Sequence, residues 1–130
     1  MKPFFDTNVI VYAQQADTKG DIARGLLEPG GTISVQVLNE FTNVLLRKHR
    51  KAWSEVEAVL SDVIDVIDVI NPISFETHGR AVVIARDHNI SFYDALIIAA
   101  AIDANCDVLF SEDLQHGRKL GGVEIVNPFR

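Results

Sequence analysis

Short apolar runs alternate along this chain with longer segments in which hydrophobic residues return every three or four positions. The first pattern is typical of buried β-strands and the second of amphipathic helices. Glycine-rich segments precede two of the apolar runs and indicate turns before them. We expect strands at Phe4–Phe5, Thr32–Val35, Asp107–Phe110 and Val123–Val126, and short helices at Val9–Ala13 and Thr18–Leu27.

The third helix has the clearest pattern, because its apolar side chains repeat at spacings of three and four residues. They are Val37, Leu38, Phe41, Val44 and Leu45. The run Arg47–Lys51 then places positive charges at the carboxyl end, where the helix dipole favours cations. Ser54 and Glu57 form a capping-box pattern that predicts the start of a fourth helix. The inner face of that helix is formed by Val56, Val59, Leu60 and Val63.

Residues 62–70 read Asp-Val-Ile three times, a period that suits neither a helix nor a strand over the whole length. We interpret them as a helix end that runs into a strand stopping at Asn71-Pro72. The aspartates are expected to form a solvated ridge without a function. Ser74 can cap a further helix that continues to His88, and Asn89 suits the left-handed position after it.

The last helix begins at Ser91, with Asp94 in a second Ser-x-x-acid arrangement. From Ala95 to Ile102 it is apolar on every face, so we expect a buried central helix. Short buried strands alternate with helices and no hairpin signal is visible. This order predicts a three-layer α/β domain around a short parallel sheet. The length of 130 residues fits one domain, 1–130.

The composition narrows the class of protein. Hydrophobic residues make up 48% and charged residues 23%, as in ordinary globular domains. Cys106 is the single cysteine, which excludes an intrachain disulfide and a multi-thiolate zinc site. The longest apolar stretch is far too short to span a bilayer, and Asp6 interrupts any signal-peptide core. We therefore expect a cytoplasmic protein without a membrane segment.

Four acidic residues are placed where they can meet. Asp6 and Asp113 each follow a predicted strand, so they project from the same carboxyl edge of a parallel sheet. Asp94 lies in the first turn of the buried helix, where an uncompensated carboxylate costs several kcal/mol. Glu40 lies beside the apolar stripe of the third helix. It belongs to one polar row that is formed by Gln36, Glu40, Asn43 and Arg47.

This acidic set suits a hard divalent cation, because Mg²⁺ and Mn²⁺ prefer oxygen ligands and retain several waters. No histidine cluster competes for a metal ion. The four histidines lack metal-ligand spacing and are expected at surface or capping positions. They are His49, His78, His88 and His116.

Four motifs in this order resemble those of the PIN-domain ribonucleases, and more narrowly the VapC-type toxins of toxin–antitoxin pairs. The motifs are Phe-Phe-Asp6-Thr7-Asn8-Val-Ile, Asn39-Glu40-Phe41, Ser91-Phe-Tyr-Asp94-Ala-Leu-Ile and Leu-Phe-Ser111-Glu112-Asp113-Leu-Gln. The resemblance implies a Rossmann-like sheet and cleavage of RNA that depends on Mg²⁺ or Mn²⁺. It further implies a homodimer and a small antitoxin whose tail blocks the site.

The resemblance also assigns residues. Asp6, Glu40, Asp94 and Asp113 match the acidic quartet of the family, and Thr7, Asn8 and Ser111 match its supporting polar positions. Glu112 stands next to Asp113, so either acid of that pair could face the metal. We expect Asp6 and Asp94 to be the principal metal ligands, completed by Glu40 and Asp113.

The net charge of −6 requires that RNA be bound by local patches. The candidate contacts are Asn43, Arg47, Lys48, Arg50, Lys51, Arg118 and Lys119. Two alternative functions stay open on the sequence. An aspartate-based phosphotransfer domain would need a second aspartate where Asn8 stands. A metal- or RNA-binding module without catalysis would keep the acids but show no turnover.

Overall fold

Six short strands form one mixed sheet in the computed structural model, which describes all residues 1–130. Their order across the sheet is β3-β2-β1-β4-β6-β5. All neighbouring strands run parallel except β5 and β6. The bounds are β1 Pro3–Phe5, β2 Thr32–Ser34, β3 Val69–Asn71, β4 Val108–Phe110, β5 Lys119–Leu120 and β6 Val123–Val126. The predicted α/β class with a parallel sheet is confirmed, with one antiparallel strand at its edge.

That edge strand corrects the expectation that the chain contains no hairpin. Gly121 and Gly122 join β5 to β6 with φ angles of 55° and 83°. Positive φ at both central residues is the hallmark of a type I′ hairpin turn, which glycine adopts without strain. The sequence hid this hairpin because β5 has only two residues, too few to show an alternating pattern.

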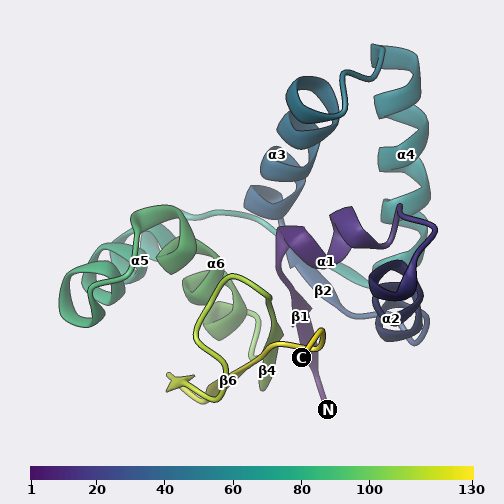
Figure 1. Cartoon of the computed structure of the whole chain (residues 1–130). Helices are drawn as coiled ribbons and strands as arrows, with labels where there is room; N and C mark the ends of the chain where they lie inside the picture. Colours follow the sequence, from purple (N-terminus) through teal and green to yellow (C-terminus); the bar gives the residue numbers. More distant parts are fainter.

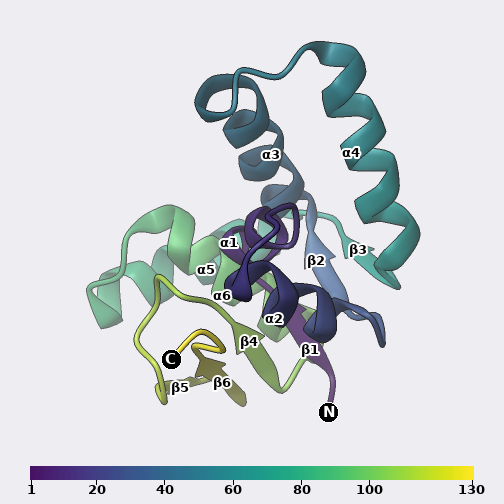
Figure 2. The ribbon, with the colours of Figure 1, turned by 45° about the vertical axis from the view of Figure 1, so that its right-hand side comes forward.

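Helices cover both faces of the sheet. Figures 1 and 2 show α5 and α6 on one face and α1 and α2 on the other, with α3 and α4 extending from the sheet as a pair. Between α3 and α4 the chain makes a π-helical turn, η1. The bounds are α1 Thr7–Tyr12, α2 Thr18–Leu27, α3 Val35–Asn43, η1 Val44–Lys48, α4 Trp53–Val66, α5 Phe75–His88 and α6 Phe92–Asp103. This arrangement is the three-layer architecture that was expected.

Some predicted helix ends are confirmed and others are wrong. Ser74 caps α5 by accepting a 3.1 Å hydrogen bond from the Thr77 amide, and Asn89 ends that helix in the left-handed conformation. Helix α4, however, starts after Ala52 and not at the Ser54 capping box. There Glu55, in the first turn of the helix, accepts a 3.0 Å hydrogen bond from the Ala52 amide. This bond caps the amino end of α4 at Ala52.

Helix α6 also differs at its start, because Ser91 makes no side-chain capping bond. Asp94 is therefore not engaged in the expected capping box. The body of the helix agrees with the prediction, since every residue from Ala95 to Ala101 is buried.

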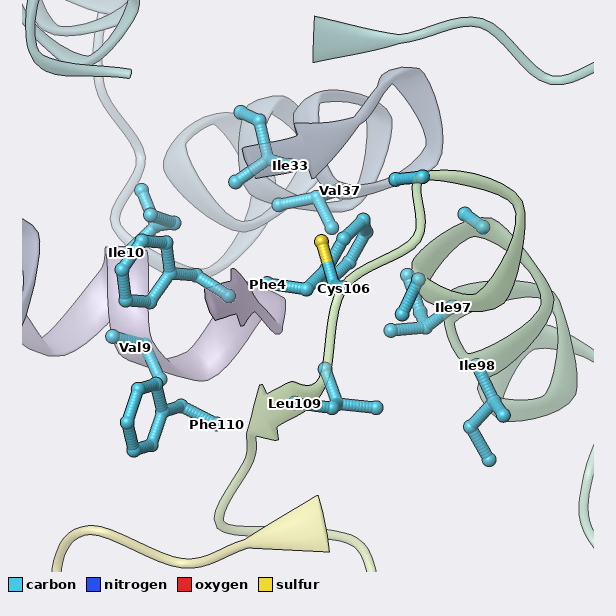
Figure 3. Packing of buried hydrophobic residues seen from close by; sticks show 14 of the residues in the cluster. Phe4, Val9, Ile10, Ile33, Val37, Ile97, Ile98, Cys106, Leu109 and Phe110 are labelled. Atoms are coloured by element: carbon cyan, nitrogen blue, oxygen red, sulfur yellow. The ribbon is translucent and has the colours of Figure 1, made fainter. Parts of the chain in front are cut away.

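The hydrophobic core forms where the central strands meet α6, α1 and α3. Figure 3 shows Phe4 of β1, Leu109 of β4, Ile33 of β2 and Ile97 of α6 packed in one cluster. The cluster contains 29 buried residues, and Cys106 is one of them as a free thiol. Strands β1 and β4 run side by side through this core, with Phe5 opposite Phe110 at their ends. None of the helices has the length and apolar character needed to cross a membrane.

Candidate active site

Asp6 is located where β1 passes into α1, at the carboxyl edge of the sheet. Its amide donates a 3.0 Å hydrogen bond to the carbonyl of Phe110 on β4. Its carboxylate accepts hydrogen bonds from the amide of Thr7 at 2.7 Å and from the hydroxyl of Ser111 at 2.6 Å. Both carboxylate oxygens are therefore oriented, one by the first residue of α1 and the other by the residue after β4.

The environment of Asp6 disfavours its charge. The residue is only 5% exposed, and burial raises the pKa of its carboxyl group to about 6. The hydrogen bonds from Ser111 and Thr7 act in the opposite direction, while the nearby charges of Glu40 and Asp113 raise the pKa further. A positive charge beside these three acids would relieve both the desolvation and the repulsion.

Glu40 reaches the same region from α3. The Thr7 hydroxyl donates a 2.6 Å hydrogen bond to its Oε1 atom, and the Gln36 side-chain amide donates a 3.2 Å bond to Oε2. The side chain is half-buried. Thr7 thus links Glu40 to Asp6, because its amide binds one acid and its hydroxyl the other.

The two acids after β4, Glu112 and Asp113, lie in different surroundings. Glu112 accepts hydrogen bonds from the Tyr12 hydroxyl and, at 2.6 Å, from the Lys19 ammonium group. The bond from Lys19, followed by that from Tyr12, holds the pKa of Glu112 below its usual value. Asp113 is exposed, lines the cavity beside Glu40 and acts electrostatically on Asp6. Of this pair, Asp113 is the acid that faces the other carboxylates.

Asn8 joins this loop to α1. Its Oδ1 atom accepts a 3.3 Å hydrogen bond from the Glu112 amide, whereas its buried Nδ2 atom has no partner. The Ser111 hydroxyl accepts a 3.4 Å bond from the Leu114 amide while it donates to Asp6. The supporting residues therefore hold the Ser111–Leu114 loop as well as the carboxylates.

A cavity of about 490 Å³ opens between α1, the end of α3 and the loop after β4. Its walls combine two acids with polar and cationic side chains. They are Thr7, Asn8, Val11, Tyr12, Gln15, Glu40, Asn43, Val44, Lys48, His49 and Asp113. A second cavity, of about 290 Å³, lies between α1, α2 and α4 and is mostly apolar. The chemistry therefore points to the first.

Glu40 and Asp113 line the cavity, and the charges of both act on Asp6, which itself does not line it. Asp94 is half-buried in the first turn of α6, but it does not line the cavity, and its charge is not among those acting on Asp6. No three acidic or histidine side chains converge closely enough to form a ready metal site. None of the four acids takes part in an ion pair. Carboxylate oxygens that have no cationic partner are suitable ligands for a hard divalent cation.

Hydrogen bonds join the members of the predicted polar row on α3 in pairs, up to Arg47 at its end. Gln36 bonds to Glu40, and Asn43 accepts a 3.1 Å hydrogen bond from the Arg47 guanidinium. Beyond Asn43 the helix changes to the π form, which takes more residues per turn than an α-helix. As a result Lys48, and not Arg47, lines the cavity.

His49 also lines the cavity, which the sequence did not indicate, because no residue pattern in this segment announces a π turn. Among the other histidines, His116 has a capping role, since its Nδ1 atom accepts a 3.0 Å bond from the Asn127 amide.

The remaining cations on the list of RNA contacts lie elsewhere. The Arg118 guanidinium donates a 3.4 Å bond to the carbonyl of His88. Lys119 pairs with Glu124, which aligns with Val108 at the start of β4. Lys119 is thus located toward the end of the sheet opposite to Asp6. Arg50 and Lys51 follow η1, with Arg50 in a left-handed conformation.

Comparison with known families identifies this fold. Residues 4–119 match the model of the PIN domain. The chain belongs to the PIN domain family. No curated protein sequence matches the chain. Solved structures nevertheless share the fold of this PIN domain over most of its length.

Three of these structures illustrate the likeness. VapC20 of Mycobacterium tuberculosis, described as a sarcin–ricin loop cleaving toxin, is 20% identical with a TM-score of 0.70, over 86% of this chain and 92% of that one. A toxin–antitoxin complex from Klebsiella pneumoniae gives 20% identity and a TM-score of 0.74 over 98% of both chains. VapBC2 of Rickettsia felis, bound to a promoter DNA fragment, gives 20% and 0.69 over 96% of this chain and 97% of that one. At this identity the likeness establishes the fold.

Proposed function

We propose that this PIN domain is a metal-dependent endoribonuclease and the toxin of a toxin–antitoxin pair. The observation that carries the proposal is the buried Asp6 carboxylate, which lies beside Glu40 and Asp113 without a cationic partner. Membership of the PIN family and the fold shared with VapC20, which is described as a sarcin–ricin loop cleaving toxin, support the same function.

The donor set suits Mg²⁺ or Mn²⁺. We assign Asp6 and Asp94 as principal ligands, with Glu40 and Asp113 completing the set directly or through water. A bound divalent ion lowers the pKa of a coordinated water and stabilises charge on the oxygens of the scissile phosphodiester. Asp94 is the assignment on which the experiment below concentrates, because its charge is not among those that act on Asp6.

The chain's own residues position the reacting groups. Ser111 and the Thr7 amide orient the two oxygens of Asp6, and the Thr7 hydroxyl fixes Glu40. Glu40 or Asp113 accepts the proton of the attacking water, which is the role of a general base. Hydrolysis then leaves a 5′-phosphate and a 3′-hydroxyl on the two RNA fragments.

The same proposal covers the partners. Structures that share this fold include toxin–antitoxin complexes from Klebsiella pneumoniae, Salmonella typhimurium and Rickettsia felis. We infer a small cognate antitoxin that covers the acidic cavity, and a homodimeric toxin. Because the proposed substrate is cellular RNA, we place its action in the cytoplasm.

The test is cleavage of total cellular RNA by purified protein with Mg²⁺, with Mn²⁺ and with EDTA. Asp6→Asn and Asp94→Asn are purified in parallel. Asp65→Asn is the matched control, since Asp65 is an exposed aspartate of α4 remote from the cavity lining. We expect cuts that need the metal, persist in the control and vanish in both site variants.

Other outcomes separate the alternatives. Full activity of Asp94→Asn would remove that residue from the ligand set. Equal background in every sample, with a mass spectrum showing the toxin alone and calorimetry showing tight metal binding, would replace the nuclease by a binding module. A second small protein in the spectrum would instead identify a retained inhibitor.

A further inference from the structure

The π-helical turn η1 changes which cation at the end of α3 belongs to the acidic cavity. In a continuous α-helix, Glu40, Asn43 and Arg47 would share one face. In the structure Glu40, Asn43 and Lys48 line the cavity, because the wider π turn shifts the later side chains by about one position.

Lys48 has no acidic partner in this position. The residue is exposed and forms no ion pair, although Glu40 and Asp113 line the same cavity. Arg47, by contrast, bonds to the Asn43 side chain and does not line the cavity. Lys48 is thus the one cavity residue with a permanent positive charge, and it does not neutralise the acids.

A cation in this place suits a phosphate more than a carboxylate partner. Lys48 follows Glu40 by eight residues, so the two side chains reach the cavity from positions about two turns apart. This spacing matches two points along an extended single strand, with the carboxylates at one phosphate and the ammonium group at another.

We propose that Lys48, presented by the π turn, binds a backbone phosphate of the RNA that flanks the cleavage site. The proposal rests on the proposed function and specifies how the acidic cavity holds a polyanion. The contact is made equally in the bound substrate and in the transition state. Its loss therefore raises KM and leaves kcat unchanged.

The test compares Lys48→Gln with Arg47→Gln, two variants that remove one positive charge from neighbouring positions. Binding of a fluorescein-labelled single-stranded RNA of mixed sequence is followed by anisotropy at several KCl concentrations with Mg²⁺. All proteins carry Asp6→Asn so that the RNA stays intact. Steady-state cleavage by the same variants without Asp6→Asn supplies kcat and KM.

We expect Lys48→Gln to weaken binding roughly tenfold at low salt. It should also lower the slope of log Kd against log salt by about 0.7, the value for one phosphate contact on a single strand. Arg47→Gln should keep the slope of its parent. In the cleavage assay Lys48→Gln should raise KM at constant kcat.

Four results would overturn the inference. They are equal losses in both variants, a larger loss in Arg47→Gln, an unchanged salt slope in Lys48→Gln, and a parent protein that binds no RNA at any salt. The proposed nuclease function is judged separately, by whether the unmodified protein cleaves RNA with metal. Cleavage that is intact in Lys48→Gln at unchanged KM leaves the nuclease standing and removes Lys48 from its RNA contacts.

Discussion

Replacing Asp6 by asparagine should stabilise the metal-free fold while abolishing cleavage. Asparagine keeps the shape of aspartate and can still accept the hydrogen bond from the Thr7 amide. The Ser111 hydroxyl can rotate to accept a bond from the new amide group. The variant therefore loses little local bonding, and it removes a buried charge that Glu40 and Asp113 repel.

The magnitude follows from the pKa. Burial raises the pKa of Asp6 from 3.8 to about 6 in the folded state, so the folded protein binds this proton more tightly than the unfolded chain. Stability from this group is therefore highest below pH 4, falls between about pH 4 and 6 and stays low above. At 1.36 kcal/mol per pKa unit the loss is about 3 kcal/mol. Asparagine does not titrate and escapes this loss.

The assay is urea unfolding in EDTA at pH 7.5 and pH 4.0, at one protein concentration. Far-UV circular dichroism is the preferred signal, because Trp53 is 63% exposed and reports poorly on the core. Asp6→Asn should exceed the wild type by about 2–3 kcal/mol at pH 7.5 and match it at pH 4.0. The exposed Asp65→Asn control should change neither value. A variant less stable than wild type at pH 7.5 would refute the electrostatic account of Asp6.

Three further predictions concern the supports of the site. Thr7→Val should reduce kcat about tenfold or more, because Glu40 loses a charged hydrogen bond of 2.6 Å, and Thr7→Ser should restore the rate. Glu112→Gln should lower kcat without changing KM, because the weakened bond to Lys19 loosens the loop that carries Asp113; an unchanged rate would free Glu112 from that role. Mn²⁺ at about 100 times its Kd should stabilise the wild type by about 2.7 kcal/mol, seen as a higher Tm. Mn²⁺ is also added to Asp6→Asn. If it raises the Tm of this variant by as much as that of the wild type, Asp6 is not a ligand.

Much of the secondary structure could be predicted from local patterns. The helix Thr18–Leu27, the strand Val123–Val126 and the cap at Ser74 all agree with the structure. Each depends on neighbours within one or two turns, so the sequence of the segment contains the relevant physics. The fully apolar face pattern from Ala95 onward likewise predicted burial, because no orientation of such a helix avoids removing apolar surface from water.

The errors have three separate physical causes. The capping-box pattern at Ser54 was overridden by the bond between Glu55 and the Ala52 amide. The edge strand β5 exists because β6 offers it a partner, since two residues alone have no strand-forming pattern. The π turn at Val44–Lys48 has no residue signature, and so the cavity received Lys48 in place of Arg47.

The sequence by itself determined that Asp6 and Asp113 end parallel strands and that Glu40 borders the core, since strand ends and helix faces follow from local periodicity. Only the tertiary structure decided that Asp113 and not Glu112 joins the cavity. The side chains of Tyr12 and Lys19, about a hundred positions away in the sequence, donate hydrogen bonds to the Glu112 carboxylate. Such a choice depends on which side chains the packed sheet brings within bonding distance, and chain neighbours alone do not contain that information.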